Sequence, residues 1–137
     1  MSVPDFARHR LYIDQPFAAA AILPLEREQA NYLLNVLRLR VEGTVLVFNG
    51  RDGEWLARLV PEGRKQASLE LVRQTKPQPP AHDLHYLFAP LKHARLDYMA
   101  QKAVEMGAGV LQPVLTRRTQ VSRLNLDRMR ANAIEAA

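Results

Sequence analysis

The sequence contains no cysteine among its 137 residues. Disulfide bonds and thiolate metal sites are therefore excluded, and the absence fits a protein of the reducing cytoplasm. The four histidines have no carboxylate partners at the spacing of metal ligands, so no metal site is expected. With 47% hydrophobic and 24% charged residues, the composition is that of a globular protein with its own core.

Long hydrophobic runs are also missing. The best candidate, FAAAAILPL (17–25), is far too short to span a membrane. It faintly resembles a signal peptide, but Asp14 and Pro16 interrupt that pattern. We expect a strand entering a turn there, no targeting signal and a cytoplasmic location.

A glycine-rich phosphate loop is a third absence. EMGAGV (105–110) follows a predicted helix instead of opening one, so it lacks the context of a dinucleotide-binding loop. No nucleophile and base stand out as a pair. Lys102 and Glu105, three residues apart, indicate a surface ion pair on one helical face. Residue chemistry alone therefore predicts no self-sufficient enzyme.

Basic residues are present in excess and are unevenly distributed. The formal net charge is +5; residues 1–75 hold ten Lys or Arg against nine Asp or Glu, and residues 76–137 hold nine against five. A local basic cluster of this kind is compatible with a polyanionic partner such as nucleic acid. An ordinary solvated surface explains the same charge equally well.

Short apolar segments separated by turn residues fill the first half of the chain. Three of them are β-rich and divided by glycine-containing turns, which predicts an antiparallel meander: 44–50, 54–60 and 67–72. Two further strands are expected over 10–13 and 20–23. Residues 25–40 carry apolar side chains at helical spacing. Five strands and one helix predict a small, partly closed β-barrel over residues 1–73.

The pattern changes after a proline-rich linker at 74–83. The segments that follow are predicted to be strand, helix, strand and helix, over 84–91, 94–107, 109–115 and 126–137. This order is typical of the βαβα start of a parallel sheet. Two strands do not complete such a sheet, so we interpret residues 84–137 as the opening of an α/β domain. The whole chain is then α+β.

The last predicted helix, LDRMRANAIEAA (126–137), begins after Asn125, a good N-cap residue, and carries an apolar stripe. Neither Gly, Asn nor Pro closes it. We therefore expect the chain to be the front part of a longer protein.

Two blocks of the sequence resemble the RsmE family of 16S ribosomal RNA uridine-N3 methyltransferases. The first is ANYLLNVLRLRVEGTVLVFNGRDGEWLARL (30–59), with RLYID near the start, and the second is APLKHARLDYMAQKAVEMGAGVLQPVLTRRTQV (89–121). The terminal IEAA resembles the start of the family's Glu-Ala-Ala-Glu-Gln motif. The blocks keep the family's order and spacing, and Met106 replaces the usual Leu, a volume-conserving change.

The resemblance implies a PUA-like RNA-binding barrel followed by the start of a SPOUT domain with a C-terminal trefoil knot. In that family the knot holds S-adenosylmethionine and forms most of a homodimer interface. The substrate is one uridine of 16S ribosomal RNA in the small ribosomal subunit. The resemblance places the knot, the cofactor loops and the catalytic residues after Ala137. We therefore expect no catalytic, cofactor-binding or metal residue within this chain, and no binding of S-adenosylmethionine by it.

The residues predicted to contact RNA are basic: Arg10, Arg38, Arg40, Lys92, Arg117 and Arg118. Arg38 and Arg40 are expected at the end of the first helix, beside Gly43 and near the Asn49-Gly50 turn; their other reading is as partners of the helix dipole. Lys92, Arg117 and Arg118 follow predicted parallel strands, whose carboxyl ends share one sheet edge. Tyr12, Tyr32 and Trp55 could stack on bases, although aromatic residues among apolar neighbours are more often core.

Three hypotheses remain open from the sequence. The first is the N-terminal portion of an RNA methyltransferase, supplying RNA binding and part of the catalytic scaffold. The second is a self-contained RNA-binding module without catalytic activity. The third is an interaction domain that does not bind RNA. The extent of the natural reading frame separates the first two.

Overall fold

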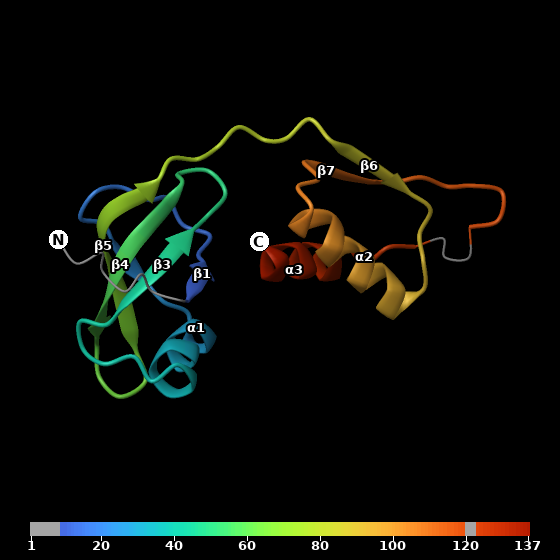
Figure 1. Ribbon diagram of the computed structural model, residues 1–137. Helices are drawn as coiled ribbons and strands as arrows, with labels where there is room; N and C mark the ends of the chain where they lie inside the picture. Colours follow the sequence, from blue (N-terminus) through green and yellow to red (C-terminus); the bar gives the residue numbers. More distant parts are fainter. Residues whose placement is uncertain (1–8, 120–122) are drawn as a thin grey trace. The chain divides into compact units, whose positions relative to one another are not determined.

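The computed structural model describes residues 9–119 and 123–137 and has α+β architecture. The chain divides into two compact units, one up to Pro79 and one from Pro80 (Figure 1). Each unit has its own hydrophobic core.

The N-terminal unit is built on one curled five-stranded sheet of order β1-β3-β4-β5-β2 (Figure 1). Its strands are β1 (Arg10–Tyr12), β2 (Ile22–Pro24), β3 (Thr44–Phe48), β4 (Glu54–Pro61) and β5 (Ala67–Lys76). β3, β4 and β5 are antiparallel neighbours, which confirms the predicted meander. β2 adds to β5 in antiparallel fashion, whereas β1 runs parallel to β3, a pairing that the sequence did not predict.

The core of this unit comes from strand residues that alternate between the two faces of the sheet. Val45 pairs with Ala57, and Leu59 pairs with Leu69, and all four side chains are buried. Leu33 from the helical segment is also completely buried against this cluster. At about 25 cal/mol per Å² of apolar surface, this burial is the main force that stabilises the unit.

The helical segment is shorter than the predicted 25–40. It consists of α1 (Arg27–Asn31) followed by a single wide π-helical turn, η1 (Tyr32–Val36). A reciprocal capping box between Glu26 and Gln29 starts it. The Leu37 amide donates to the Tyr32 carbonyl at 2.9 Å, five residues back, and this bond closes the π turn.

Arg38 follows the helix in the left-handed conformation, with φ of 51°. The next amide, that of Leu39, donates to the Leu33 carbonyl at 2.9 Å and completes a C-terminal cap. Arg38 and Arg40 therefore lie beyond the helix and not in its last turn. The expectation that the first helix runs on to Arg38 and Arg40 is wrong for this reason.

A second expectation about these arginines also needs correction. The Gly43 amide donates to the Arg40 carbonyl at 2.8 Å in a tight turn just before β3, whereas Asn49-Gly50 follows the other end of that strand. Arg38 and Arg40 thus lie at the opposite end of β3 from the Asn49-Gly50 turn. Gly43 suits the close approach here, because a Cβ atom would meet the Arg40 carbonyl oxygen at 2.9 Å.

The C-terminal unit has the predicted strand–helix–strand–helix order. Its elements are β6 (His85–Phe88), α2 (His93–Glu105), β7 (Val110–Pro113) and α3 (Leu126–Ala136), and the two strands are parallel. Asn125 caps α3 as expected, since its side chain accepts from the Arg128 amide at 3.1 Å. Gly109 before β7 admits no side chain, because a Cβ atom would lie 1.9 Å from the His82 carbonyl oxygen.

The segment between the two units carries no regular secondary structure over residues 77–84. The predicted linker began at residue 74, but β5 continues to Lys76. The reason is that Thr75 holds the strand in place: its hydroxyl donates to the Glu54 carbonyl oxygen at 3.0 Å. The prolines that follow cannot continue a central ladder.

None of the helices in the described part of the chain has the length and apolar character that crossing a membrane requires.

We predict that brief digestion with a non-specific protease cuts this chain within residues 77–84. The exposed, irregular backbone there can enter a protease site, whereas the strands of the sheet cannot. Mass spectrometry should show a resistant piece containing residues 9–76. We expect the N-terminal unit to be the more stable of the two. Survival of a C-terminal piece with the N-terminal sheet digested would contradict this expectation.

Candidate nucleic-acid interface

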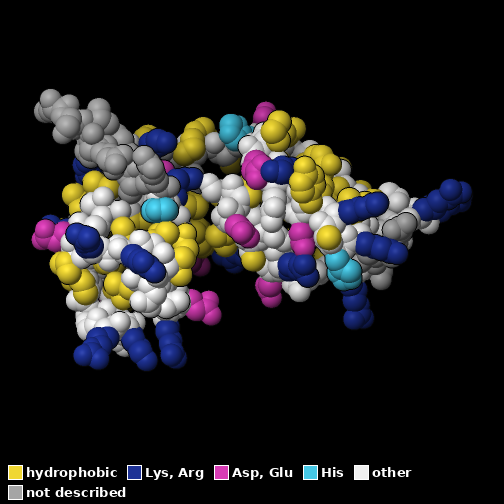
Figure 2. All heavy atoms as spheres, turned by 60° about the horizontal axis from the view of Figure 1, so that its bottom comes forward, with side chains coloured by type: hydrophobic (Ala, Val, Ile, Leu, Met, Phe, Trp, Pro, Cys, Tyr) yellow, Lys and Arg dark blue, Asp and Glu magenta, His cyan; other side chains and the backbone are white. Residues whose placement is uncertain are grey.

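Exposed arginine and lysine side chains project into solvent from both units (Figure 2). Arg38 and Arg40 belong to the loop between η1 and β3, and both are exposed. Neither forms an ion pair among the described residues. Their guanidinium groups are therefore available to an external anion such as a phosphate.

Arg10 has a different environment. Its Nε atom donates to the Glu54 carboxylate at 2.9 Å, and its guanidinium lies 4.5 Å from the ring centre of Phe48. The Glu54 side chain is only 8% exposed. Much of the hydrogen-bonding capacity of Arg10 thus serves to compensate a buried carboxylate.

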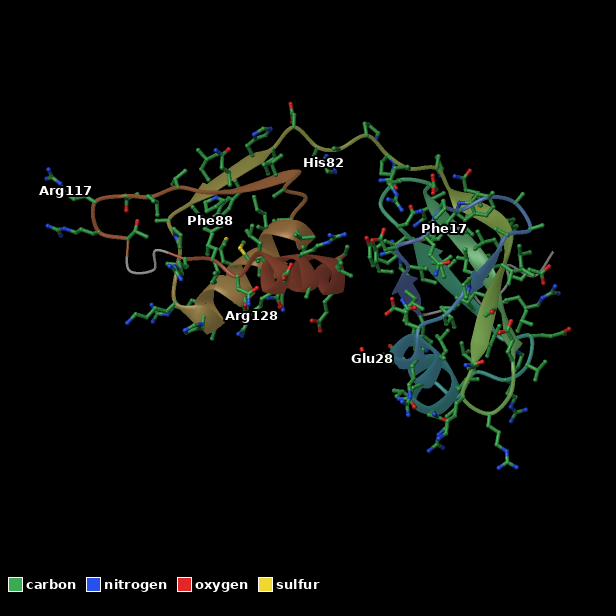
Figure 3. The ribbon with its side chains drawn as sticks, turned by 180° about the vertical axis from the view of Figure 1, so that it is seen from behind. Phe17, Glu28, His82, Phe88, Arg117 and Arg128 are labelled. Atoms are coloured by element: carbon green, nitrogen blue, oxygen red, sulfur yellow. The ribbon has the colours of Figure 1, made fainter. Side chains whose placement is uncertain are left out.

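In the C-terminal unit, Lys92 immediately precedes α2, and Arg117 and Arg118 follow β7. The two arginines occupy the centre of a turn that Thr116 and Thr119 close. The Thr119 amide donates to the Thr116 carbonyl at 3.2 Å, and the Thr116 amide donates to the Thr119 hydroxyl at 2.7 Å. This turn points Arg117 outward into solvent (Figure 3).

Lys92 and this arginine turn follow the carboxyl ends of paired parallel strands, as predicted. No interaction joins Lys92 to either arginine among the described residues. Lys92, Arg117 and Arg118 therefore follow the same edge of the β6–β7 sheet but do not form one interacting cluster within the described residues.

Arg128 is occupied in holding α2 and α3 together. Its Nε atom lies 3.0 and 3.1 Å from the two Asp97 carboxylate oxygens, and Asn132 donates to the same carboxylate at 2.9 Å. The hydrogen bond from Arg128 is the main cause that lowers the pKa of Asp97 below its ordinary value of 3.8. Gln101 extends the network by donating to Asn132 at 3.1 Å.

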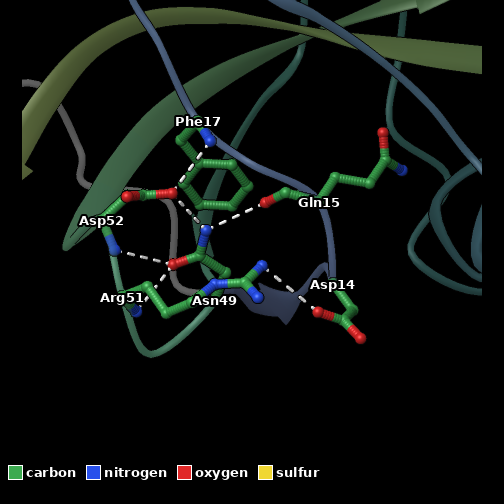
Figure 4. Close-up of polar contacts among 6 residues, drawn as sticks. All are labelled: Asp14, Gln15, Phe17, Asn49, Arg51 and Asp52. Atoms are coloured by element: carbon green, nitrogen blue, oxygen red, sulfur yellow. Dashed lines mark hydrogen bonds and ion pairs between the residues drawn. The ribbon is translucent and has the colours of Figure 1, made fainter.

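The turn between β3 and β4 contains a polar network that sequence reasoning recognised only as a turn (Figure 4). The Asn49 side chain is buried; its Nδ2 donates to the Gln15 carbonyl at 2.9 Å and to the Asp52 carboxylate at 2.7 Å. Its Oδ1 accepts from the amides of Arg51 and Asp52 at 2.9 and 2.8 Å. Asp52 also accepts from the Phe17 amide at 3.0 Å, the leading cause that lowers its pKa.

Sequence reasoning also missed a groove at the other end of the sheet, lined by both polar and apolar side chains. Arg27 and Lys65 both line two cavities there, of about 580 and 480 Å³. A lone arginine in a first helical turn and a lysine in a hairpin loop carry no pattern that distinguishes them from ordinary surface charges. Their common position becomes apparent only in the folded chain, where both side chains line one groove.

The aromatic candidates for base stacking contribute mainly to packing. Tyr12 packs edge-on against Phe48 with ring centres 5.7 Å apart. The Trp55 indole nitrogen donates to the Asp52 carbonyl at 2.8 Å. Only Tyr32, 40% exposed, presents a substantial part of its ring to solvent.

The chain matches two family models in series. Residues 25–72 match the RNA methyltransferase PUA domain, and residues 77–137 match the RNA methyltransferase domain. The class is therefore that of RNA methyltransferases that carry a PUA domain. The chain is similar to proteins named ribosomal RNA small subunit methyltransferase E, which confirms the resemblance seen in the sequence.

The relative from Rickettsia conorii is 30% identical over 129 residues, which are 93% of this chain and 53% of that protein. The relative from Buchnera aphidicola is 22% identical over 107 residues, 77% of this chain and 42% of that protein. Among solved structures, the Neisseria gonorrhoeae methyltransferase E bound to S-adenosyl methionine superposes with a TM-score of 0.80 at 25% identity. The superposition includes 93% of this chain and 54% of the Neisseria chain. The chain thus spans about half the length of the relatives it matches.

S-adenosylmethionine carries carboxylate, ammonium and ribose groups that need several polar partners, and the groove between β6 and α2 does not offer them. The groove of about 370 Å³ between β6 and α2 is lined mostly by apolar side chains, including Leu84, Met99 and Met106. Its one charged group, Lys102, already donates to Glu105 at 2.7 Å. No group of three or more metal-binding side chains occurs within 9–119 and 123–137 either.

We predict that Asp97→Asn lowers the thermal unfolding temperature at pH 7, because it removes the charge that Arg128 binds between α2 and α3. The folded-state pKa of Asp97 is lowered, so its stabilising effect is present above pH 3.8 and is lost as pH falls through the folded-state pKa. The difference from the wild-type chain should therefore shrink below pH 3.8 in circular-dichroism melts. Glu135→Gln, an exposed change on α3, is the control and should leave the unfolding temperature unchanged. A constant difference at all pH values would show that the Asp97 charge is not what matters.

Proposed function

We propose that this chain supplies the RNA-binding part and the beginning of the catalytic domain of a methyltransferase that modifies N3 of a uridine in 16S ribosomal RNA. The observation that carries the proposal is the pair of family matches, RNA methyltransferase PUA domain and then RNA methyltransferase domain, on two separately folded units. The names of the relatives support the small ribosomal subunit as the partner.

At the level of fold, we infer that the curled sheet is a PUA-like barrel and that the βαβα unit opens a SPOUT domain. Gln15, just after edge strand β1, donates to the Pro24 carbonyl of edge strand β2 at 2.8 Å, which supports a partly closed barrel. Gln29 of α1 donates to the Tyr12 carbonyl of β1 at 3.3 Å and joins the helix to the same edge. The knot, the S-adenosylmethionine site and a homodimer interface belong, in this proposal, to sequence that the relatives have and this chain does not. The site of action is the cytoplasm, where ribosomal subunits are assembled.

Six basic residues are proposed as RNA contacts: Arg10, Arg38, Arg40, Lys92, Arg117 and Arg118. The last five are supported by their exposure and by the absence of ion pairs to other residues within 9–119 and 123–137. Arg10 makes the weakest case, because Glu54 and Phe48 already engage its guanidinium.

A second candidate function is RNA binding without catalysis. It is favoured by the exposed cations on the described residues together with the mostly apolar lining of the groove between β6 and α2. The mass of the natively expressed protein decides between the two. A native mass of 15.5 kDa supports the binding module, and a mass about twice as large supports the methyltransferase.

We predict salt-sensitive binding of a 16S ribosomal RNA fragment by the purified chain. If about three to five phosphates are contacted, log K should fall against log salt with a slope of about −2 to −4. The double change Arg38→Gln with Arg40→Gln should weaken binding and make the slope shallower by about 1.5 to 2. Fluorescence anisotropy over a salt series measures both quantities.

The matched control is Arg73→Gln with Lys76→Gln, which removes the same charge from exposed positions of β5. An equal effect of the two double changes would mean that only net charge matters. A salt-independent affinity would remove the phosphate contacts from the proposal altogether.

We predict further that the 137-residue chain neither binds S-adenosylmethionine nor methylates small ribosomal subunits. The reason is that, in this proposal, the cofactor site belongs to the half of the relatives' sequence that this chain does not match. Titration calorimetry with the cofactor and a radiolabelled methyl-transfer assay provide the measurements. Micromolar binding, or turnover by this chain, would place the active site within these residues and overturn the assignment.

A further inference from the structure

The N-terminal unit has a groove between its helical segment and the β4–β5 loop, both at the same end of the sheet (Figure 1). Two neighbouring cavities form it, of about 580 and 480 Å³, and both are lined by Arg27 and Lys65. Asn31 and Asn35 line the helical side, and Gln66 lines the loop side.

The walls of the groove are held by backbone and side-chain hydrogen bonds. The β4–β5 loop is closed by the Glu62 amide, which donates to the Gln66 carbonyl at 2.8 Å. The Glu62 carboxylate accepts from the buried Ser68 hydroxyl at 2.8 Å, which anchors the loop to β5. On the opposite wall the wide η1 turn keeps Leu33 fully buried while Asn31 and Asn35 remain exposed.

Asn31 and Asn35 are preorganised as a pair. Asn35 Nδ2 donates to Asn31 Oδ1 at 2.6 Å. This assignment leaves the Asn31 amide nitrogen as a donor and the Asn35 amide oxygen as an acceptor. A donor beside an acceptor is complementary to the edge of an unpaired nucleobase, which offers the same two functions in reverse order.

The charges of the groove suit a nucleotide better than a bare anion. Arg27 and Lys65 have no ion pair among the described residues, and they can bind backbone phosphates. Glu28, on α1 (Figure 3), is also exposed and can accept from an exocyclic amino group. Because the cations are balanced by Glu28 and Glu62, charge alone would not hold a polyanion here, so the amides must contribute.

We propose that this groove binds a single-stranded segment of RNA, with Arg27 and Lys65 on its phosphates and the Asn31–Asn35 pair on the edge of one base. The proposal rests on the proposed function, because it names the form of RNA that the N-terminal unit recognises. In a duplex the Watson–Crick edges of the bases are already used in pairing, so a duplex cannot present such an edge to this pair of amides.

The test measures anisotropy of short fluorescent RNA homopolymers, and of a duplex of equal length, with the complete 137-residue chain. Arg27→Gln with Lys65→Gln should weaken every single-stranded probe about tenfold, because two charge-assisted contacts are lost. Asn31→Ala with Asn35→Ala should reduce the preference among oligo(U), oligo(A) and oligo(C) while keeping the salt slope. Arg73→Gln with Lys76→Gln is the charge-matched control and should have less than a threefold effect.

Photo-crosslinking provides the second measurement. RNA containing 4-thiouridine should crosslink to peptides that include residues 27–35 or 65–66. Each variant should also melt at the wild-type temperature, which excludes misfolding as the cause of a loss of RNA binding. If the wild-type chain binds no RNA, the RNA-binding part of the proposed function fails. If it binds RNA but the groove variants match the control, or if the duplex binds equally well, the groove proposal is overturned and the proposed function stands.

Discussion

The buried amide of Asn49 is the interaction on which the N-terminal unit depends. One side chain fixes the turn between β3 and β4, through two backbone amides, and also holds the segment at Gln15 that joins the two edge strands of the sheet. Asp52 completes the link by accepting from Asn49 and from the Phe17 amide. Each buried polar group left without its partner would cost about 1–3 kcal/mol, so Asn49 holds the β3–β4 turn and the segment between the two edge strands in a fixed relation.

Much of the fold could be predicted because the relevant information is local. The meander follows from alternating apolar residues and glycine turns, and the βαβα order follows from a change of period after the prolines. The end of the first helix could not be predicted in this way. Leu37 and Leu39 continue the apolar pattern past Val36, but the π turn shifts the register by one residue and Arg38 adopts a positive φ. The parallel pairing of β1 with β3 depends on a contact between distant residues that no local pattern encodes.

The candidate interface could be predicted only as a set of basic residues. The carboxyl ends of parallel strands share one edge of a sheet, and this rule depends on topology alone. It correctly placed Lys92 and Arg117 after parallel strands. It could not show that Thr116 and Thr119 present Arg117 on a closed turn, or that Arg10 and Arg128 are engaged by carboxylates. Arg27 and Lys65 lie 38 positions apart in the sequence and share a groove only because β2 and β5 are paired. Their charges are unremarkable until the sheet is formed.

The sheet topology also has a consequence for the order of folding. β3, β4 and β5 are joined by short turns and can pair within microseconds, whereas Arg10 must find Leu46 and Ile22 must find Glu70 across long stretches of chain. Synthesis on the ribosome proceeds from the N-terminus, so β1 and β2 emerge well before the strands that will receive them. The edge strands β1 and β2 therefore remain unpaired until β3, β4 and β5 have left the exit tunnel. The speed at which this unit becomes native is set by the docking of its earliest residues.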